Sequence, residues 1–120
     1  MAKMVKKDAE RLLAAVPANN AFWCCDGHTL RSMRELETAL IDMANETFAY
    51  HSNSDKSDFS TWVGGAIGDD KLARDLAKSP NRSQAAKYAK ARITFLEHKV
   101  GLEDSWVRNT SQPSLYNETQ

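Results

Sequence analysis

Residues 48–63, FAYHSNSDKSDFSTWV, are the stretch that decides the fold. Two aromatic-rich segments flank a polar loop at 52–56, whose serine, asparagine and aspartate residues favour a turn. Asn45 and Ser57 carry side chains of the kind that cap helix N-termini, so we expect one short helix from Glu46 and another after Ser57. The pattern predicts two short helices joined by a polar loop, with four aromatic rings and a histidine packed around it.

The aromatic side chains of this stretch are the candidate core of the domain. Phe48 and Tyr50 precede the loop, and Phe59 and Trp62 follow it. Phe59 and Trp62 are three residues apart, which places both on one face of a helix. Rings of this size bury a large apolar area, so we expect all four to anchor the fold.

Apolar residues recur at helical spacing through most of the remaining chain. This periodicity predicts further helices over residues 5–16, 32–43, 69–77 and 81–100. Residues 21–25 form an apolar run that is too short for a helix; we expect it to be extended, with no second strand available to make a sheet. The predicted fold class is therefore all-α: a single domain of five or six short helices over residues 1–106, with one short extended segment near residues 21–25.

Capping and terminating residues mark the ends of these helices. Ser32 and Glu35 have the spacing of a capping box, in which each side chain accepts a hydrogen bond from a backbone amide of the other. Gly68 and Gly101 stand where helix ends are expected. Beyond the last helix, residues 107–120 have little apolar surface to bury and are predicted to form a disordered C-terminal tail.

The composition sets limits on the partners of this chain. Its 120 residues carry 16 Lys and Arg against 16 Asp and Glu, so no net charge draws it to nucleic acid or to an anionic membrane. No apolar run approaches the roughly 20 residues of a membrane span, so we expect a cytoplasmic protein with no membrane partner. Cys24 and Cys25 are adjacent, a spacing that suits neither a disulfide nor a zinc or redox pair, and we predict two buried free thiols.

His51 is the titratable residue of greatest interest, because Asp55 and Asp58 follow it by four and seven positions. A carboxylate bonded to its ring would fix the tautomer, as in catalytic and metal-binding histidines. The same pair describes a structural clasp between two helices, and without a nucleophile the clasp is favoured. The candidate functional cluster is His51, Asp55, Asp58 and Trp62, and no residue is predicted to be catalytic.

Metal-binding residue types are scattered along the chain. His28, His51 and His98 lack the H-x-x-x-H spacing of paired ligands. Asn53 and Asp55 alternate like part of a calcium loop, but the glycine and the glutamate that complete such a loop are missing. No glycine-rich phosphate loop is present either. We therefore expect no metal and no cofactor.

Charge is uneven along the chain despite its neutral total. Residues 26–58 carry seven acidic and three basic side chains, whereas residues 82–99 carry five basic and one acidic. The candidate basic surface on the last helix consists of Arg82, Lys87, Lys90 and Lys99. Such a surface suits nucleic-acid phosphate or an acidic protein. Opposite charges of this kind also pair between subunits, so self-association is an alternative.

Several short motifs follow one another in the middle of the chain. They are Asp26-Gly27, Leu30, Glu35-Leu36 with Leu40, Phe48 with Tyr50-His51, Asp58-Phe59 with Trp62, and Gly68-Asp69 with Leu72-Ala73. In this order they resemble an uncharacterised prokaryotic domain family, whose members occur alone or beside carbohydrate-active and glycosyltransferase-like regions. The resemblance covers residues 22–97 and implies a small, mainly helical domain, with no activity, cofactor or substrate. Gly64-Gly65 and Cys24-Cys25 depart from the family's pattern.

These features favour a non-catalytic module that binds another protein. The predicted helices carry no catalytic constellation, and Trp106 lies beyond the last predicted helix, where we expect it to be partly exposed and suited to a partner contact. The alternatives are weak nucleic-acid binding through the basic last helix and, last, a small enzyme centred on His51 and Asp58.

Overall fold

The fold consists of short helices and one small hairpin. The computed structural model describes residues 4–108, with side chains described for residues 4–101. In chain order the elements are α1 Lys6–Leu13, a 3₁₀ turn Ala18–Asn20, β1 Phe22–Trp23, β2 Thr29–Leu30, α2 Met33–Asp42, α3 Asn45–His51, α4 Asp58–Trp62, a π-helical turn Val63–Ile67, α5 Asp70–Ala77 and α6 Arg82–Arg108. The prediction of a mainly helical fold is confirmed.

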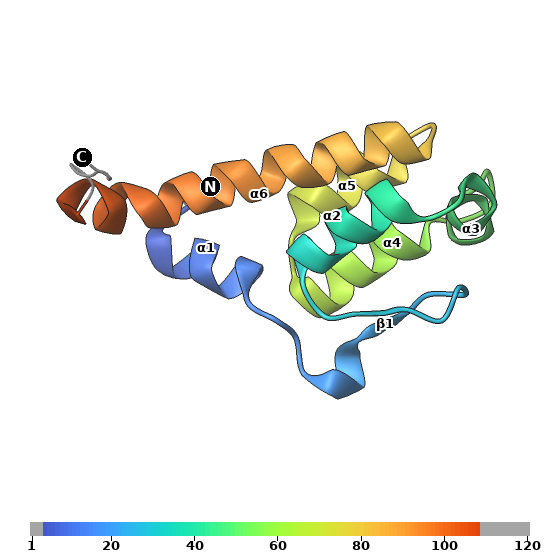
Figure 1. Cartoon of the computed structure of the whole chain (residues 1–120), viewed down its shortest axis with the longest axis horizontal. Coiled ribbons are helices and arrows are strands. Elements are labelled where there is room, and N and C mark those ends of the chain that lie inside the picture. The colour runs from blue at the N-terminus through green and yellow to red at the C-terminus, as the bar shows by residue number, and fades with distance from the viewer. Residues whose placement is uncertain (1–3, 109–120) are drawn as a thin grey trace.

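Helix α6 is the element on which the shorter helices pack. Helices α2 and α5 lie along its N-terminal half, and α1 packs against it further towards its C-terminus (Figure 1). The hairpin β1–β2 lies on the other side of α2 and α4, away from α6. Helices α2 and α4 therefore lie between α6 and the hairpin (Figure 1).

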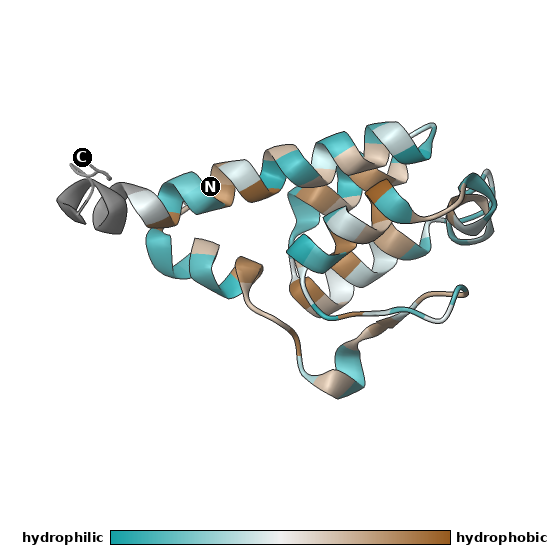
Figure 2. Cartoon of the chain, viewed as in Figure 1, coloured by the Kyte–Doolittle hydropathy of each residue, from teal (hydrophilic) through white to brown (hydrophobic). Residues whose placement is uncertain are grey.

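The core lies between α6 and the shorter helices, where the apolar residues meet (Figure 2). Leu36 and Leu40 of α2, Leu72 of α5 and Leu96 of α6 are fully buried. Burying one leucine side chain contributes about 1.5–3 kcal/mol. Ala89, on the face of α6 that points to the core, is also fully buried. Because its side chain is small, a neighbouring helix can come close.

The aromatic stretch is core, as the sequence predicts, with one exception. Phe48 stacks on Phe59 at a centroid distance of 5.7 Å, and Phe59 and Trp62 are both buried. Phe22 of β1 completes the cluster, 5.2 Å from Phe59 and 5.8 Å from Trp62. Tyr50 is 61% exposed, so its prediction as core is wrong. It lies two residues after the buried Phe48, and positions two apart on a helix face different sides.

The extended segment near residues 21–25 is confirmed as β1, but it does not stand alone. It pairs antiparallel with β2, with Phe22 opposite Leu30 and Trp23 opposite Thr29. Gly27 makes the turn between them at a φ of 99°, a conformation that glycine adopts at little cost. The expectation of no second strand is wrong, because two paired residues are too few to leave an alternating pattern in the sequence.

Serine side chains cap two of the helices, as the sequence predicts. Ser32 accepts a hydrogen bond from the backbone amide of Glu35 at 3.2 Å, and Ser57 caps α4 in the same way at 3.3 Å. The Glu35 carboxylate departs from the predicted capping box, because it accepts from the amide of Arg31 at 2.7 Å and not from that of Ser32. The side chain therefore satisfies an amide one residue earlier in the chain.

Asn45 does not cap α3, and this prediction is wrong. The N-cap position belongs to Ala44, and Asn45 is the first residue of the helix. The Asn45 Oδ1 atom instead accepts a hydrogen bond from Arg82 Nε at 3.0 Å. The Asn45 side chain, predicted to cap α3, therefore binds the first residue of α6.

A π-helical turn and a glycine join α4 to α5. Gly68 ends the turn with a φ of 93°, as its predicted role as a terminator requires. Gly64 lies against α5, where a Cβ added to it would sit 3.4 Å from the Ala73 Cβ atom. Ser60 Oγ donates a hydrogen bond to the Ala73 carbonyl at 2.7 Å. The small residues therefore let the two helices fold back on each other closely.

Helix α6 is longer than predicted. It runs through Gly101 to Arg108, so the prediction that Gly101 ends it is wrong. A glycine ends a helix where it adopts a left-handed conformation, and the described glycines with positive φ are Gly27 and Gly68. Helix α6 also includes residues 107 and 108, which the sequence places in the tail. The rest of the predicted tail, residues 109–120, and the side chain of Trp106 lie outside the described part of the structure.

A buried ion pair locks α5 to α6. Asp69 caps α5 through Oδ1, which accepts from the Leu72 amide at 3.1 Å, while its Oδ2 accepts from Arg92 Nε at 2.7 Å. The side chains are 1% and 15% exposed. Removing one partner of such a pair leaves a buried charge without compensation, which is more costly than the pair itself is favourable.

We therefore expect Asp69→Ala to lower the free energy of unfolding by about 3–5 kcal/mol, since it removes both the cap and the partner of Arg92. Asp70→Ala is the matched control, because Asp70 is exposed and its substitution costs at most about 1 kcal/mol. Urea unfolding followed by circular dichroism measures both. Equal midpoints for the two variants would show that the buried pair does not stabilise the fold.

Candidate functional site

His51 is buried, and both of its ring nitrogens are bonded. Nε2 accepts a hydrogen bond from the backbone amide of Cys25 at 3.0 Å. Nδ1 lies 2.9 Å from Asp58 Oδ2. Because Nε2 accepts, the ring proton must lie on Nδ1, which donates to the carboxylate. His51 is thus a neutral histidine with no free nitrogen.

The ring of His51 is also packed on its faces and edges. Its centroid lies 5.0 Å from that of Phe22, 5.4 Å from Phe59 and 5.0 Å from Tyr50. Its side chain is only 6% exposed. These contacts join the hairpin, α3 and α4 at one point, which is the arrangement of a structural clasp.

Asp58 holds the other side of this clasp. Burial raises the pKa of Asp58, but hydrogen bonds from His51 and Lys56 outweigh that effect and bring the pKa below its ordinary value of 3.8. Lys56 Nζ lies 3.0 Å from the same Oδ2 atom that His51 contacts. Asp58 therefore stays ionised at neutral pH, with both interactions in place.

The side chains of the other two members of the predicted cluster form no direct hydrogen bond with His51 or Asp58 in the described part of the chain. The side chain of Asp55 is exposed and forms no hydrogen bond or ion pair within residues 4–101. Trp62 is buried, and its Nε1 donates to the Asn20 carbonyl at 2.7 Å. The structure brings His51 and Asp58 into direct contact, places Trp62 in the same aromatic cluster through Phe22, and leaves Asp55 in solvent.

The four residues of the predicted basic surface do not share one face of α6. Arg82 is used within the fold, because its Nη1 donates to the Leu40 and Ile41 carbonyls at the end of α2, at 2.8 Å each. Lys90 and Lys99 are nine residues apart, which is about two and a half helical turns and places them on opposite sides.

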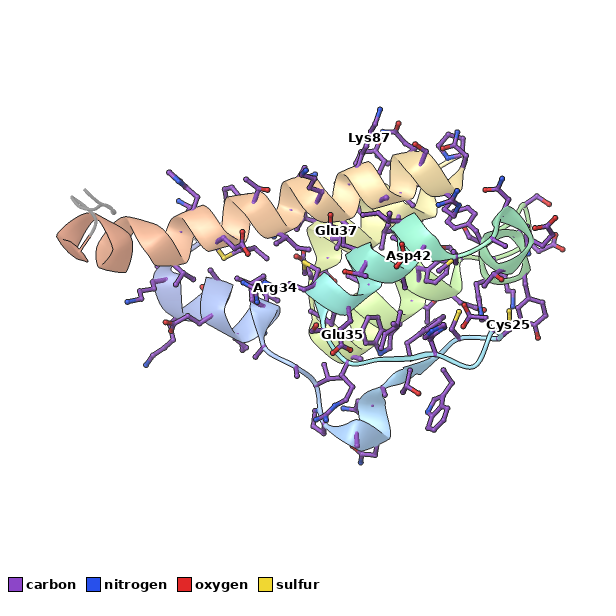
Figure 3. The ribbon with its side chains drawn as sticks, in the orientation of Figure 1. Cys25, Arg34, Glu35, Glu37, Asp42 and Lys87 are labelled. Atoms are coloured by element: carbon purple, nitrogen blue, oxygen red, sulfur yellow. The ribbon has the colours of Figure 1, made fainter. Side chains whose placement is uncertain are left out.

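Lys87 and Lys90 are the part of this surface that lies together. They are three residues apart and both are exposed. Lys87 projects from the side of α6 that faces away from α2 (Figure 3). Lys99 instead lies over the ring of Phe95, with Nζ 5.5 Å from its centroid.

The two cysteines differ in exposure. Cys24 is buried, as predicted, and burial raises the pKa of its thiol, which keeps it protonated and unreactive at neutral pH. Cys25 is exposed, so its prediction as buried is wrong. Cys24 follows the buried Phe22 by two residues and reaches the same side, whereas Cys25 lies in the turn between the two strands.

A groove between α2 and the hairpin is the site that sequence reasoning missed. Its volume is about 410 Å³. It is lined on one side by Glu35, Thr38, Ala39 and Asp42 of α2, followed by Met43, with Arg34 at the edge, and on the other by Asp26, His28, Thr29 and Leu30. Glu35 and Asp42 lie towards opposite ends of α2 (Figure 3). Its signal in the sequence is the spacing of the four α2 positions, which places them on one face of the helix.

Asp26, in the turn of the hairpin, contributes an acidic side chain to this groove. Hydrogen bonds from the backbone amide and the ring of His28, each 3.0 Å from Asp26 Oδ1, lower the pKa of Asp26 below its ordinary value. Asp26 is therefore ionised at neutral pH. It adds a third carboxylate to those of Glu35 and Asp42.

Comparison with known proteins returns no relative: no family model, no curated protein and no solved structure matches this chain. The resemblance to an uncharacterised prokaryotic family stays a prediction. The interpretation of the site therefore depends on its geometry.

Two classes of feature are not found in the described part of the chain. Residues 4–108 include no helix with an apolar stretch that is long enough to cross a bilayer. Within the same residues, no three His, Cys, Asp or Glu side chains come together as a metal site.

If His51 is a structural clasp, His51→Ala destabilises the domain by about 2–4 kcal/mol, because it leaves a cavity and the Cys25 amide without its acceptor. Asp55→Ala, on the exposed loop four residues after His51, is the control and changes stability by less than about 0.5 kcal/mol. Thermal and urea unfolding measure the difference. An His51→Ala variant as stable as the wild type would contradict the clasp.

Asp58 makes the stability of the fold depend on pH in the acidic range. Its pKa is lower in the folded chain than in the unfolded chain, so the stabilisation is complete above the ordinary value of 3.8 and is lost as the pH falls through the lower folded value. We expect Asp58→Asn to cost about 1 kcal/mol at pH 6 and progressively less below pH 3.8. Urea unfolding of both proteins at several pH values measures this difference; a cost independent of pH would rule out the linkage.

Proposed function

We propose that this chain is a non-catalytic module that binds another protein through the groove between α2 and the hairpin β1–β2. The groove is the observation that carries the proposal. Its volume of about 410 Å³ falls within the roughly 300–1,000 Å³ of typical binding sites. Leu30 and Met43 are buried side chains that line it, so it offers an apolar floor beneath polar edges.

The state of His51 supports a module without catalysis. A general base needs a ring nitrogen that can take a proton from a substrate. Both nitrogens of His51 are already bonded, one to a backbone amide and one to Asp58, and the ring is buried. The enzyme alternative centred on His51 and Asp58 therefore has no observation in its favour.

Nucleic-acid binding through α6 has less support than protein binding through the groove. Phosphate contacts along a duplex require several cations on one face. Arg82 is bonded to the end of α2, and Lys99 lies on the opposite side from Lys90. Two exposed lysines remain, Lys87 and Lys90, which is a small electrostatic footprint for nucleic acid.

The cytoplasm is the location that we propose. Cys24 and Cys25 are both free thiols, and free thiols are typical of a reducing compartment.

Filling the groove tests the proposal. Thr38 is exposed and lines the groove, so we expect Thr38→Tyr to occupy its space and to abolish partner binding without unfolding the chain. Thr94→Tyr is the matched control, because Thr94 is also an exposed helical threonine and lies on α6 outside the groove. The measurement is quantitative mass spectrometry of proteins captured from a native extract by the wild type and by each variant.

The expected result is a protein whose recovery falls about tenfold or more with Thr38→Tyr, equivalent to about 1.4 kcal/mol, and is unchanged with Thr94→Tyr. Equal recovery by the wild type and both variants would contradict binding through the groove. Circular dichroism of the variants confirms that the loss does not come from unfolding.

A further inference from the structure

The groove carries negative charge that the fold leaves uncompensated. Asp42 lines it, and the Asp42 side chain forms no hydrogen bond or ion pair within residues 4–101. Glu35 uses one oxygen for the Arg31 amide, and Asp26 uses one for His28. The Cys24 thiol also hydrogen-bonds the Asp26 carboxylate, whereas Glu35 keeps an oxygen for which the described chain provides no donor.

The cations near the groove do not cancel this charge. The guanidinium of Arg34 donates through both Nε and Nη2 to Glu97 Oε2, at 3.2 and 2.9 Å, so it is already paired with α6. The ring of His28 is 77% exposed and lies against Asp26. A ligand that enters the groove therefore meets a net negative site.

The position of Asp42 is unfavourable for the helix that carries it. It is the last residue of α2, where the helix dipole is negative and an acidic side chain is destabilising. Arg82 donates to the Leu40 and Ile41 carbonyls at this end and offsets part of the dipole, but no ion pair joins it to Asp42. A cation from a partner would pair the carboxylate that the described chain leaves unpaired.

The shape of the groove separates two anionic ends by an apolar middle. Glu35 and Asp42 are seven residues apart, which is two helical turns or about 10.5 Å along α2. Ala39 lies between them on the same face, with the buried side chains of Leu30 and Met43 beneath. The complement of this pattern is an aliphatic side chain between two cations.

We propose that the groove binds a basic segment of another protein, with an aliphatic side chain over Ala39 and lysine or arginine side chains near Glu35 and Asp42. This inference rests on the proposed function, since it names the partner of the same groove. It depends on charge complementarity and on the apolar floor together, because exposed ion pairs alone contribute only about 0.2–1 kcal/mol each.

Three short peptides and the full ¹⁵N-labelled chain test it by NMR titration at low salt. The basic peptide acetyl-KALAK-amide has two ammonium groups on an extended backbone, with leucine between them. Acetyl-EALAE-amide reverses its charge, and acetyl-KASAK-amide removes its apolar anchor. We expect KALAK to shift the amides of Thr29, Thr38 and Ala39, KASAK to bind about fivefold more weakly, and EALAE not to bind.

Asp42→Lys is the decisive variant, because Asp42 has no structural partner to lose. It should weaken KALAK binding by about fivefold or more, while removing an anion from the negative end of α2 leaves the fold at least as stable. Asp55→Lys makes the same charge change on an exposed loop outside the groove, and should alter the affinity by no more than about twofold.

Several results would overturn the basic segment as occupant: equal binding of EALAE, no shift with any peptide, or equal shifts with spermidine, which would indicate a small polyamine. Shifts of the groove amides on concentrating the chain alone would indicate a second copy as the occupant. If no peptide binds but capture of a protein still depends on Thr38, the groove function stands and only its basic partner is wrong. If neither is observed, both proposals fall.

Discussion

The imidazole of His51 joins three segments of the chain that are distant in sequence. Its Nε2 holds the hairpin at Cys25, its Nδ1 holds the start of α4 at Asp58, and its own backbone belongs to α3. The hairpin needs this support, because β1 and β2 pair over only two residues and a two-stranded sheet is marginal by itself. The hairpin in turn forms one wall of the groove, so the shape of the candidate site depends on a buried ring outside it.

Three arginines show how the fold uses positive charge. Arg82 satisfies the last carbonyls of α2, Arg92 pairs with the buried Asp69, and Arg34 pairs with Glu97 across α2 and α6. Arginine suits such positions because its planar guanidinium donates in several directions at once. Because these three guanidinium groups are engaged within the fold, the exposed basic side chains of the predicted surface that lie together are Lys87 and Lys90, and no cation of the described chain pairs with Asp42 in the groove.

Local signals in the sequence predicted the local structure well. The caps Ser32 and Ser57 and the terminator Gly68 act over three or four residues, and the structure confirms each of them. The His51–Asp58 contact also spans only seven residues and lies within the predicted cluster. The second hydrogen bond of His51 could not be predicted, because its donor is the backbone amide of Cys25, 26 residues earlier. Nearly every residue has a backbone amide, so the sequence does not indicate which one will bind the ring.

The groove is the clearest case of a site hidden by its context. Glu35, Thr38, Ala39 and Asp42 form the outer face of an amphipathic helix, and such a face normally points to solvent. It becomes one wall of a groove only because the hairpin lies beside it, held there by His51. The sequence shows the spacing of these residues and the acidic excess of residues 26–58, but not the second wall. Recognition of the site therefore required the three-dimensional position of a two-residue strand, the element with the weakest signal in the chain.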